Sequence, residues 1–107
     1  MIVISEEDLK EIPSIDEELS NVNKKVYLKF YLPSTNKKWF VTQAKKQASN
    51  DIIFFGLVHN DYYVDWEYFS LSELNKEVSV YNDVVKIDTD IERLHINRLN
   101  NLFKAES

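Results

Sequence analysis

The run at residues 51–58 constrains the fold of this 107-residue chain more than any other segment. Its sequence, DIIFFGLV, places apolar side chains on both faces of an extended strand. A strand of this kind has to be covered on each side, or at least paired with neighbouring strands along both edges. Gly56, the only glycine of the chain, falls inside this run and predicts a bulge or a close backbone contact there.

Three further segments have the patterns of strands. Residues 25–32 alternate between an apolar face and a face of lysine and tyrosine. The apolar face consists of Val26, Leu28, Phe30 and Leu32. A turn then leads into a return strand at residues 38–44, which gives a basic hairpin, but the alternation leaves open whether Trp39 or Phe40 faces inward. Residues 62–69, which are crowded with aromatic side chains, form another strand.

Helical patterns flank these strands. Ser5 has the position of an N-cap before three acidic residues, and Pro13 ends the helix that it starts. A serine and a glutamate with capping-box spacing predict a second short helix at residues 71–76. Residues 78–87 have the pattern of a short hairpin. Residues 89–104 repeat apolar side chains at helical spacing and predict a C-terminal helix.

These elements predict an α+β fold with a mainly antiparallel sheet of about four or five strands, flanked by an N-terminal acidic helix and a C-terminal helix. The length predicts a single domain at residues 1–107. It divides into an acidic helical segment at 1–20, a sheet region at 24–88 and the C-terminal helix at 89–104. The chain has no signal-peptide pattern and no apolar stretch long enough to span a bilayer, so we expect a cytoplasmic protein.

The charged residues are unevenly distributed. Residues 24–46 contain seven lysines and no acidic residue, and five aromatic residues lie among the lysines. Cationic side chains interleaved with aromatic ones suit a polyanion or an acidic protein partner. The candidates for nucleic-acid binding by this hairpin are Lys25, Tyr27, Lys29, Tyr31, Lys37, Lys38 and Trp39. Alternatively, the lysines protect an edge hairpin from aggregation, with the acidic N-terminal segment folded back over them.

Two acidic segments are the candidates for binding a protein partner. In the stretch at residues 59–69, carboxylates alternate with aromatic side chains that suit an interface. Its candidate residues are Asp61, Tyr63, Asp65, Trp66 and Glu67. The N-terminal candidates are Glu6, Glu7, Glu11, Glu17 and Glu18. We expect the apolar residues Leu9, Ile12, Ile15 and Leu19 to dock the N-terminal segment and to leave these acids outward. The competing interpretation is a solvated helical face and a solvated turn above core aromatics.

Enzymatic chemistry is not predicted. One glycine excludes glycine-rich phosphate loops and a nucleophile elbow, and the absence of cysteine excludes a thiolate nucleophile and a cysteine metal site. His59 lies in a predicted turn, and His95 lies on a predicted helix beside leucines. We therefore expect no catalytic residues, no cofactor and no metal.

Four segments carry a resemblance to a known family. They are VYLKFYLP at 26–33, WFVT at 39–42, FFGLV at 54–58 and YFSLSEL at 68–74. In these segments the chain resembles a family of small uncharacterised α+β domains carried on bacterial plasmids, phages and integrated elements. The resemblance covers about residues 26–74 and implies a mobile-element or phage setting. The family has no established activity, so the resemblance assigns no role to any residue.

Together these features predict a small non-enzymatic binding protein of a phage or mobile element that occupies a surface on a host protein complex. Because acidic side chains can compete for a channel built to hold phosphates, a nucleic-acid-handling defence system is the expected target. The protein would then be an inhibitor of the anti-CRISPR or antirestriction type. The alternative is a nucleic-acid-binding accessory or regulatory protein that uses the basic hairpin at 24–46.

Overall fold

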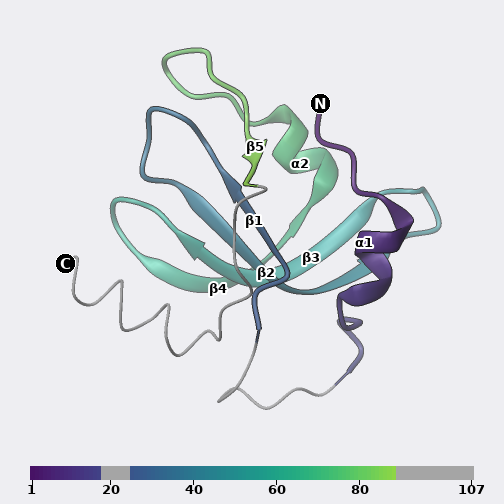
Figure 1. The fold of residues 1–107 in the computed structure, drawn as a ribbon. Coiled ribbons are helices and arrows are strands. Elements are labelled where there is room, and N and C mark those ends of the chain that lie inside the picture. Colours follow the sequence, from purple (N-terminus) through teal and green to yellow (C-terminus); the bar gives the residue numbers. More distant parts are fainter. Residues whose placement is uncertain (18–24, 89–107) are drawn as a thin grey trace.

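The computed structural model describes residues 1–17 and 25–88 and contains a five-stranded antiparallel sheet (Figure 1). The strands are β1 (Leu28–Tyr31), β2 (Lys38–Lys46), β3 (Ile52–His59), β4 (Val64–Ser70) and β5 (Lys86–Ile87), in the order β4-β3-β2-β1-β5. The helices are α1 (Glu6–Glu11), near the N-terminus, and α2 (Leu71–Lys76), which follows β4 directly. The predicted α+β fold is confirmed, whereas the predicted C-terminal helix at 89–104 lies outside the described residues.

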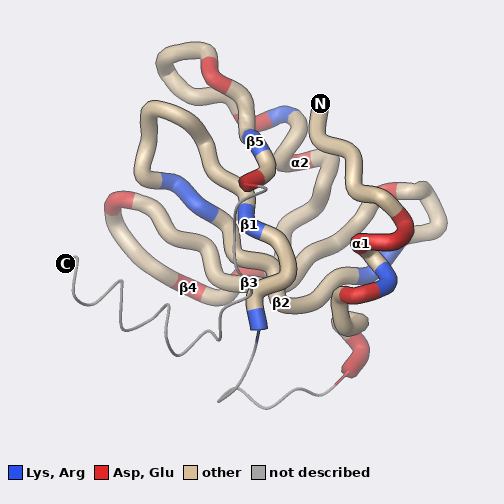
Figure 2. Tube along the Cα trace, in the orientation of Figure 1, with Lys and Arg blue, Asp and Glu red and all other residues tan. Residues whose placement is uncertain are grey.

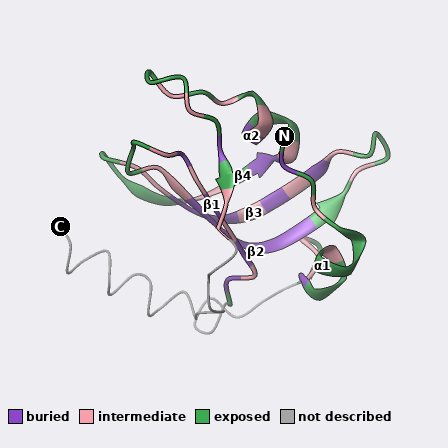
Figure 3. Cartoon of the chain, turned by 45° about the horizontal axis from the view of Figure 1, so that its top comes forward, coloured by how far each residue is buried: buried purple, intermediate pink, exposed green. Residues whose placement is uncertain are grey.

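The strand β3 lies inside the sheet, as its two apolar faces predict. It pairs with β2 along one edge and with β4 along the other. Its Phe54 is fully buried at the centre of the core, with ring centroids 5.5 Å from Phe30 and 5.6 Å from Phe69. Leu74 of α2 and Ile12 from the N-terminal segment belong to the same buried cluster. Figure 3 shows buried positions along the central strands β2 and β3.

The inward face of the β1–β2 hairpin is now defined. The four apolar residues predicted to face inward are 0–9% exposed, namely Val26, Leu28, Phe30 and Leu32. On β2, Trp39 and Val41 belong to the core cluster. Phe40 points to the opposite face of the sheet and is still only 3% exposed. Large side chains on both faces of β2 are buried, which explains why alternation alone does not identify the inward face.

Gly56 is required by a close approach of two backbones. A Cβ built on Gly56 would overlap the carbonyl group of Phe40, whose carbon would lie only 2.8 Å away. The register between β2 and β3 shifts between Val41 and Gln43, directly beside the pair formed by Val41 and Gly56. The shift places an extra residue, Thr42, on β2, and its hydroxyl donates to the carbonyl oxygen of Phe55 at 3.1 Å. Both predicted features, a close contact and a bulge, are therefore present at this position.

Side chains cap both helices as the sequence predicts. The Ser5 hydroxyl accepts from the Asp8 amide at 3.1 Å, and the Ser70 hydroxyl accepts from the Glu73 amide at 3.1 Å. Asp51, which precedes β3, provides a second contact at the start of α2. Its carboxylate accepts from the Ser72 hydroxyl at 2.7 Å and from the Ser72 amide at 3.1 Å. The end of the 47–51 turn is thus fastened to the first turn of α2.

The N-terminal segment docks through both apolar and polar contacts. Ile12 is 6% exposed, and Leu9 is partly buried against the core. Asn75 of α2 binds the backbone of Ile2, accepting from its amide at 2.7 Å and donating to its carbonyl oxygen at 3.2 Å. The Nε2 group of Gln43 donates to the carbonyl oxygens of Ser14 and Glu17 at 2.9 and 3.0 Å. The predicted apolar docking is confirmed for these two side chains. Ile15 is half-buried and does not belong to the core cluster, and Leu19 lies outside the described residues.

The hairpin predicted at residues 78–87 is only partly formed. Val78 and Val84 make a single antiparallel bridge, and Asn82 adopts a positive φ of 63° in the turn between them. Beyond this bridge, β5 pairs with β1 instead of with residues 78–81. The turn was predicted correctly, but the partner of the last strand was not.

Replacing Gly56 with alanine is expected to destabilise the fold by about 2–4 kcal/mol, because the added methyl group would force β2 and β3 apart. Urea unfolding followed by tryptophan fluorescence measures the change. Ser49→Ala, in the exposed 47–50 turn, is the matched control and should shift the free energy of unfolding by less than about 0.5 kcal/mol. Equal stabilities of G56A and S49A would contradict this account of the contact.

Replacing Asp51 with asparagine is expected to lower stability at neutral pH and to have little effect in acid. Hydrogen bonds from the Ser72 hydroxyl and the Ile52 amide hold the pKa of Asp51 below its ordinary value of 3.8. The charged carboxylate therefore stabilises the fold above about pH 3.8, and this contribution is lost as the pH falls through the folded-state pKa. Urea midpoints between pH 7 and pH 2.5 test this, with Asp83→Asn as the control. If the urea midpoints of D51N and the parent chain differ by the same amount at every pH in this range, the charge of Asp51 does not contribute to stability.

Candidate binding surfaces

Four lysines of the basic segment are held in ion pairs within the chain. Lys37 lies 2.7 Å from Glu77, and Lys45 lies 2.6 Å from Asp16. The other two pairs are Lys29–Asp88 at 3.3 Å and Lys46–Glu6 at 3.2 Å. In Figure 2 the basic end of β2 lies beside acidic positions of α1, and the basic position of β1 lies beside an acidic position that follows β5. Exposed pairs contribute only about 0–1 kcal/mol each, but they reduce the positive charge offered to a polyanion.

The structure divides the predicted nucleic-acid residues between the two faces of the hairpin. Lys29, Tyr31 and Lys38 line an open cavity of about 360 Å³ beside the turn at residues 33–35. Trp39 does not belong to this surface, because it is 3% exposed and part of the core. Its prediction as a base-stacking residue is wrong. Lys37 extends over the Trp39 ring, at 5.0 Å from the centroid, on the side of the sheet that carries the core.

The remaining two basic-hairpin candidates lie just before β1. Lys25 is exposed, and Tyr27 is half-buried against the core cluster. The Tyr27 amide donates to the carbonyl oxygen of Val41 at 2.9 Å, which extends the contact between the two strands of the hairpin. The side chain of Tyr27 packs partly against the core, so only part of it remains exposed.

The acidic and aromatic residues of the β3–β4 hairpin form an exposed tip. Tyr62 is 92% exposed and Tyr63 is 48% exposed. The turn is fixed by side-chain hydrogen bonds, because the Asn60 side-chain oxygen accepts from both tyrosine amides, at 2.8 and 3.0 Å. Asp61 accepts from the side-chain amide of Asn36 at 2.7 Å, which ties the tip to the β1–β2 turn. The tip therefore presents its tyrosines from a defined backbone.

The five candidate residues of this hairpin do not share one face. Glu67 lies opposite Gly56, and Asp65 lies opposite Val58, so both stand on the face that carries the core. Trp66 lies on the other face, where its ring stacks on Phe55 with centroids 5.4 Å apart. Alternation along β4 separates residues that are neighbours in sequence.

The N-terminal acids lie far from this tip. Glu6 pairs with Lys46, which is opposite Ile52 at the start of β3, whereas Asp61 follows the end of the same strand. The length of β3 therefore separates the two acidic regions. Glu7, Glu11 and Glu17 are exposed, and Glu18 lies outside the described residues. The two acidic segments form separate surfaces.

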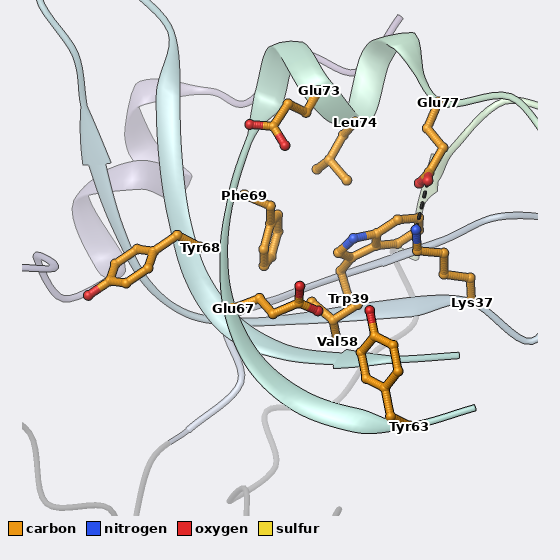
Figure 4. A pocket seen from close by; sticks show the side chains of 10 residues that line it. All are labelled: Lys37, Trp39, Val58, Tyr63, Glu67, Tyr68, Phe69, Glu73, Leu74 and Glu77. Atoms are coloured by element: carbon orange, nitrogen blue, oxygen red, sulfur yellow. Dashed lines mark hydrogen bonds and ion pairs between the residues drawn. The ribbon is translucent and has the colours of Figure 1, made fainter. Parts of the chain in front are cut away.

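A pocket that the sequence did not predict lies between α2 and the β3–β4 hairpin. Its volume is about 170 Å³, and its floor consists of Trp39, Val58, Phe69 and Leu74. Its rim carries Lys37, Tyr63, Glu67, Glu73 and Glu77. Figure 4 shows the Glu67 side chain entering between Phe69 and Trp39, while Tyr68 points away from the floor. No local pattern in the sequence indicates this pocket, because Glu77 is the C-cap residue after α2 and the other lining residues come from separate segments of the chain.

Other kinds of site lack support in the part of the chain that the structure describes. No group of three or more His, Cys, Asp or Glu side chains there is arranged to hold a metal ion. Among residues 1–17 and 25–88, no helix has the length and apolar character needed to cross a membrane.

Comparisons with protein-family models, with curated proteins and with solved structures found no match. The family resemblance of the four segments at 26–74 thus stays a prediction.

Proposed function

We propose that the chain is a non-enzymatic binding protein of a phage or mobile element that occupies a surface on a host protein complex. The proposed target is a nucleic-acid-handling defence system, which makes the protein an inhibitor of the anti-CRISPR or antirestriction type. The observation that carries the proposal is the exposed tip of the β3–β4 hairpin, where Tyr62 and Tyr63 stand beside Asp61 and Asp65.

The tip has the composition of a protein interface. Tyrosine supplies a large apolar contact area with few rotatable bonds, and it is enriched among residues that dominate binding energy. Tyr62 is almost fully exposed although its backbone is fixed by Asn60, so its ring is available to a partner from a defined backbone position. Val64, at the start of β4, is 39% exposed and extends the apolar area of the tip.

The negative charge of the tip supports the proposal that the partner is a protein that normally binds phosphate groups. Asp61 and Asp65 are exposed beside the tyrosines, and Glu67 follows on the same strand. Carboxylates gain Coulomb energy in a channel lined with lysine and arginine, because such a channel concentrates positive potential. The phage or mobile-element setting rests on the four sequence segments at 26–74, and it makes a host defence complex the natural partner of this kind.

A second candidate function is nucleic-acid binding by the β1–β2 hairpin. The open cavity that brings Lys29, Tyr31 and Lys38 together favours it. It ranks second because Lys29 is already paired with Asp88 and because Trp39, one of the predicted stacking residues, is buried.

Affinity capture with the tagged full chain, expressed in its natural host, tests the first proposal. One dominant nucleic-acid-handling complex should be recovered, and Tyr62→Ser with Tyr63→Ser should lower its yield at least about tenfold, as expected for interface anchors. Tyr81→Ser is the matched control, because Tyr81 is 70% exposed in the separate turn at residues 79–83. Recovery of no protein, or equal loss with both variants, would contradict the proposal.

Titration of the purified chain with labelled single- and double-stranded DNA and RNA separates the two candidates. We expect no binding at moderate salt. If the second candidate is correct, binding at low salt will weaken steeply as salt is added, because counterion release drives it. Lys29→Glu with Lys38→Glu would then abolish the binding, whereas Lys76→Glu on α2 would not.

A further inference from the structure

We infer that the pocket between α2 and the β3–β4 hairpin receives an arginine side chain of the partner protein. This inference rests on the proposed function, because it identifies the chemistry by which the partner is recognised. The pocket adjoins the tip through Tyr63, which lines the pocket and is also one of the exposed tyrosines. One partner surface can therefore contact the tip and fill the pocket together.

The size and floor of the pocket suit one long side chain. Its volume of about 170 Å³ lies below the roughly 300–1,000 Å³ of sites that hold drug-sized molecules. Trp39, Phe69 and Leu74 in its floor are 3%, 6% and 2% exposed, so the floor is apolar and already well packed. Such a floor accommodates the methylene stem of a basic side chain while the charged head stays at the rim.

The rim is negatively charged. Three carboxylates, those of Glu67, Glu73 and Glu77, face one lysine, Lys37. Lys37 is committed to Glu77, at 2.7 Å. Glu67 is half-buried, and within residues 1–17 and 25–88 it makes no hydrogen bond or ion pair. A half-buried carboxylate gains most from a donor that reaches it inside the pocket, because burial weakens its hydration.

The pocket already binds one cation of the chain itself. The ammonium group of Lys37 lies 5.0 Å from the centroid of the Trp39 ring and 2.7 Å from the Glu77 carboxylate. An aromatic face and a carboxylate thus hold a positive charge at one end of the pocket (Figure 4). Tyr63 and Glu67 offer the same two groups at the other end.

A guanidinium group fits this second end better than another ammonium group. Its planar fork donates two parallel hydrogen bonds to one carboxylate, and its flat face stacks on an aromatic ring. Glu67 can accept the fork while Tyr63 provides the ring. An ammonium group would make the ion pair without the stacking or the bidentate geometry.

Titration of the ¹⁵N-labelled full chain with the peptide acetyl-Gly-Arg-Gly-amide tests the inference. We expect saturable shifts of the Trp39 indole signal and of the amide signals of Phe69 and Leu74. The same peptide with citrulline in place of arginine keeps the shape without the charge, and it should bind at least about tenfold more weakly. Glu67→Gln should weaken arginine binding by a similar factor, whereas Asp83→Asn, outside the pocket, should not change it.

The outcomes separate the pocket from the proposed function. The assignment to arginine is overturned if the arginine peptide binds no more tightly than the citrulline peptide, or no more tightly than a peptide with lysine in its place. It is also overturned if E67Q, in a folded variant, has no effect. If, in the capture experiment, E67Q recovers the same complex at full yield while the Tyr62 and Tyr63 double variant loses it, the pocket's role is overturned and the proposed function stands. Saturable, Glu67-dependent arginine binding without any captured complex supports the pocket's chemistry and overturns the proposed function.

Discussion

The backbone contact between Gly56 and the carbonyl group of Phe40 determines how the two longest strands fit together. Because nothing larger than hydrogen fits there, β2 and β3 approach closely and β2 accommodates one extra residue at Thr42. After this bulge Gln43 lies opposite Phe55, and Ala44 turns into the core opposite Phe54. Without the extra residue, Gln43 would point into the core. Its amide group instead binds the backbone of residues 14–17. The docking of the N-terminal segment therefore depends on the register shift directly beside Gln43.

The parts of the fold that the sequence predicts are those with local causes. Ser5 and Ser70 cap helices through contacts only three residues away, and the alternation at residues 25–32 follows from the pleat of a strand. The run at 51–58 identifies an interior strand because two apolar faces can be buried only there. By contrast, the contact between Ile2 and Asn75 joins residues 73 positions apart, and no local pattern encodes it. The pairing of β5 with β1 is likewise set by tertiary packing, and the residues of the turn at 79–83 do not determine it.

The candidate surfaces were less predictable than the fold, because a charged side chain pairs with whatever lies close to it in space, and that partner can be distant in the sequence. The lysine-rich segment reads as a continuous basic site, yet three of its lysines pair with acids 29 or 40 positions away, and Lys29 pairs with Asp88. Trp39 stands among lysines in the sequence, as a base-stacking residue would, but the alternation of the strand places its side chain in the core. The pocket went unpredicted for the opposite reason. Its carboxylates come from β4, from α2 and from the residue after α2, and only the fold brings them to one rim.

Pairing within the chain changes which charges are left to face a partner. In the pairs Lys45–Asp16 and Lys46–Glu6, acids of the N-terminal segment are neutralised by lysines at the C-terminal end of β2. These pairs also link the segment to that end of the strand. The pair Lys37–Glu77 neutralises a lysine just before the N-terminal end of β2, and both of its residues line the pocket. Near the tip, the carboxylates of Asp61, Asp65 and Glu67 have no ion pair within the described residues. They outnumber the one nearby lysine outside these pairs, Lys38, which lies opposite His59. A chain whose sequence is most conspicuous for its lysines thus presents carboxylates and tyrosines at the edge formed by β4, and a cationic protein surface suits that edge better than a nucleic acid does.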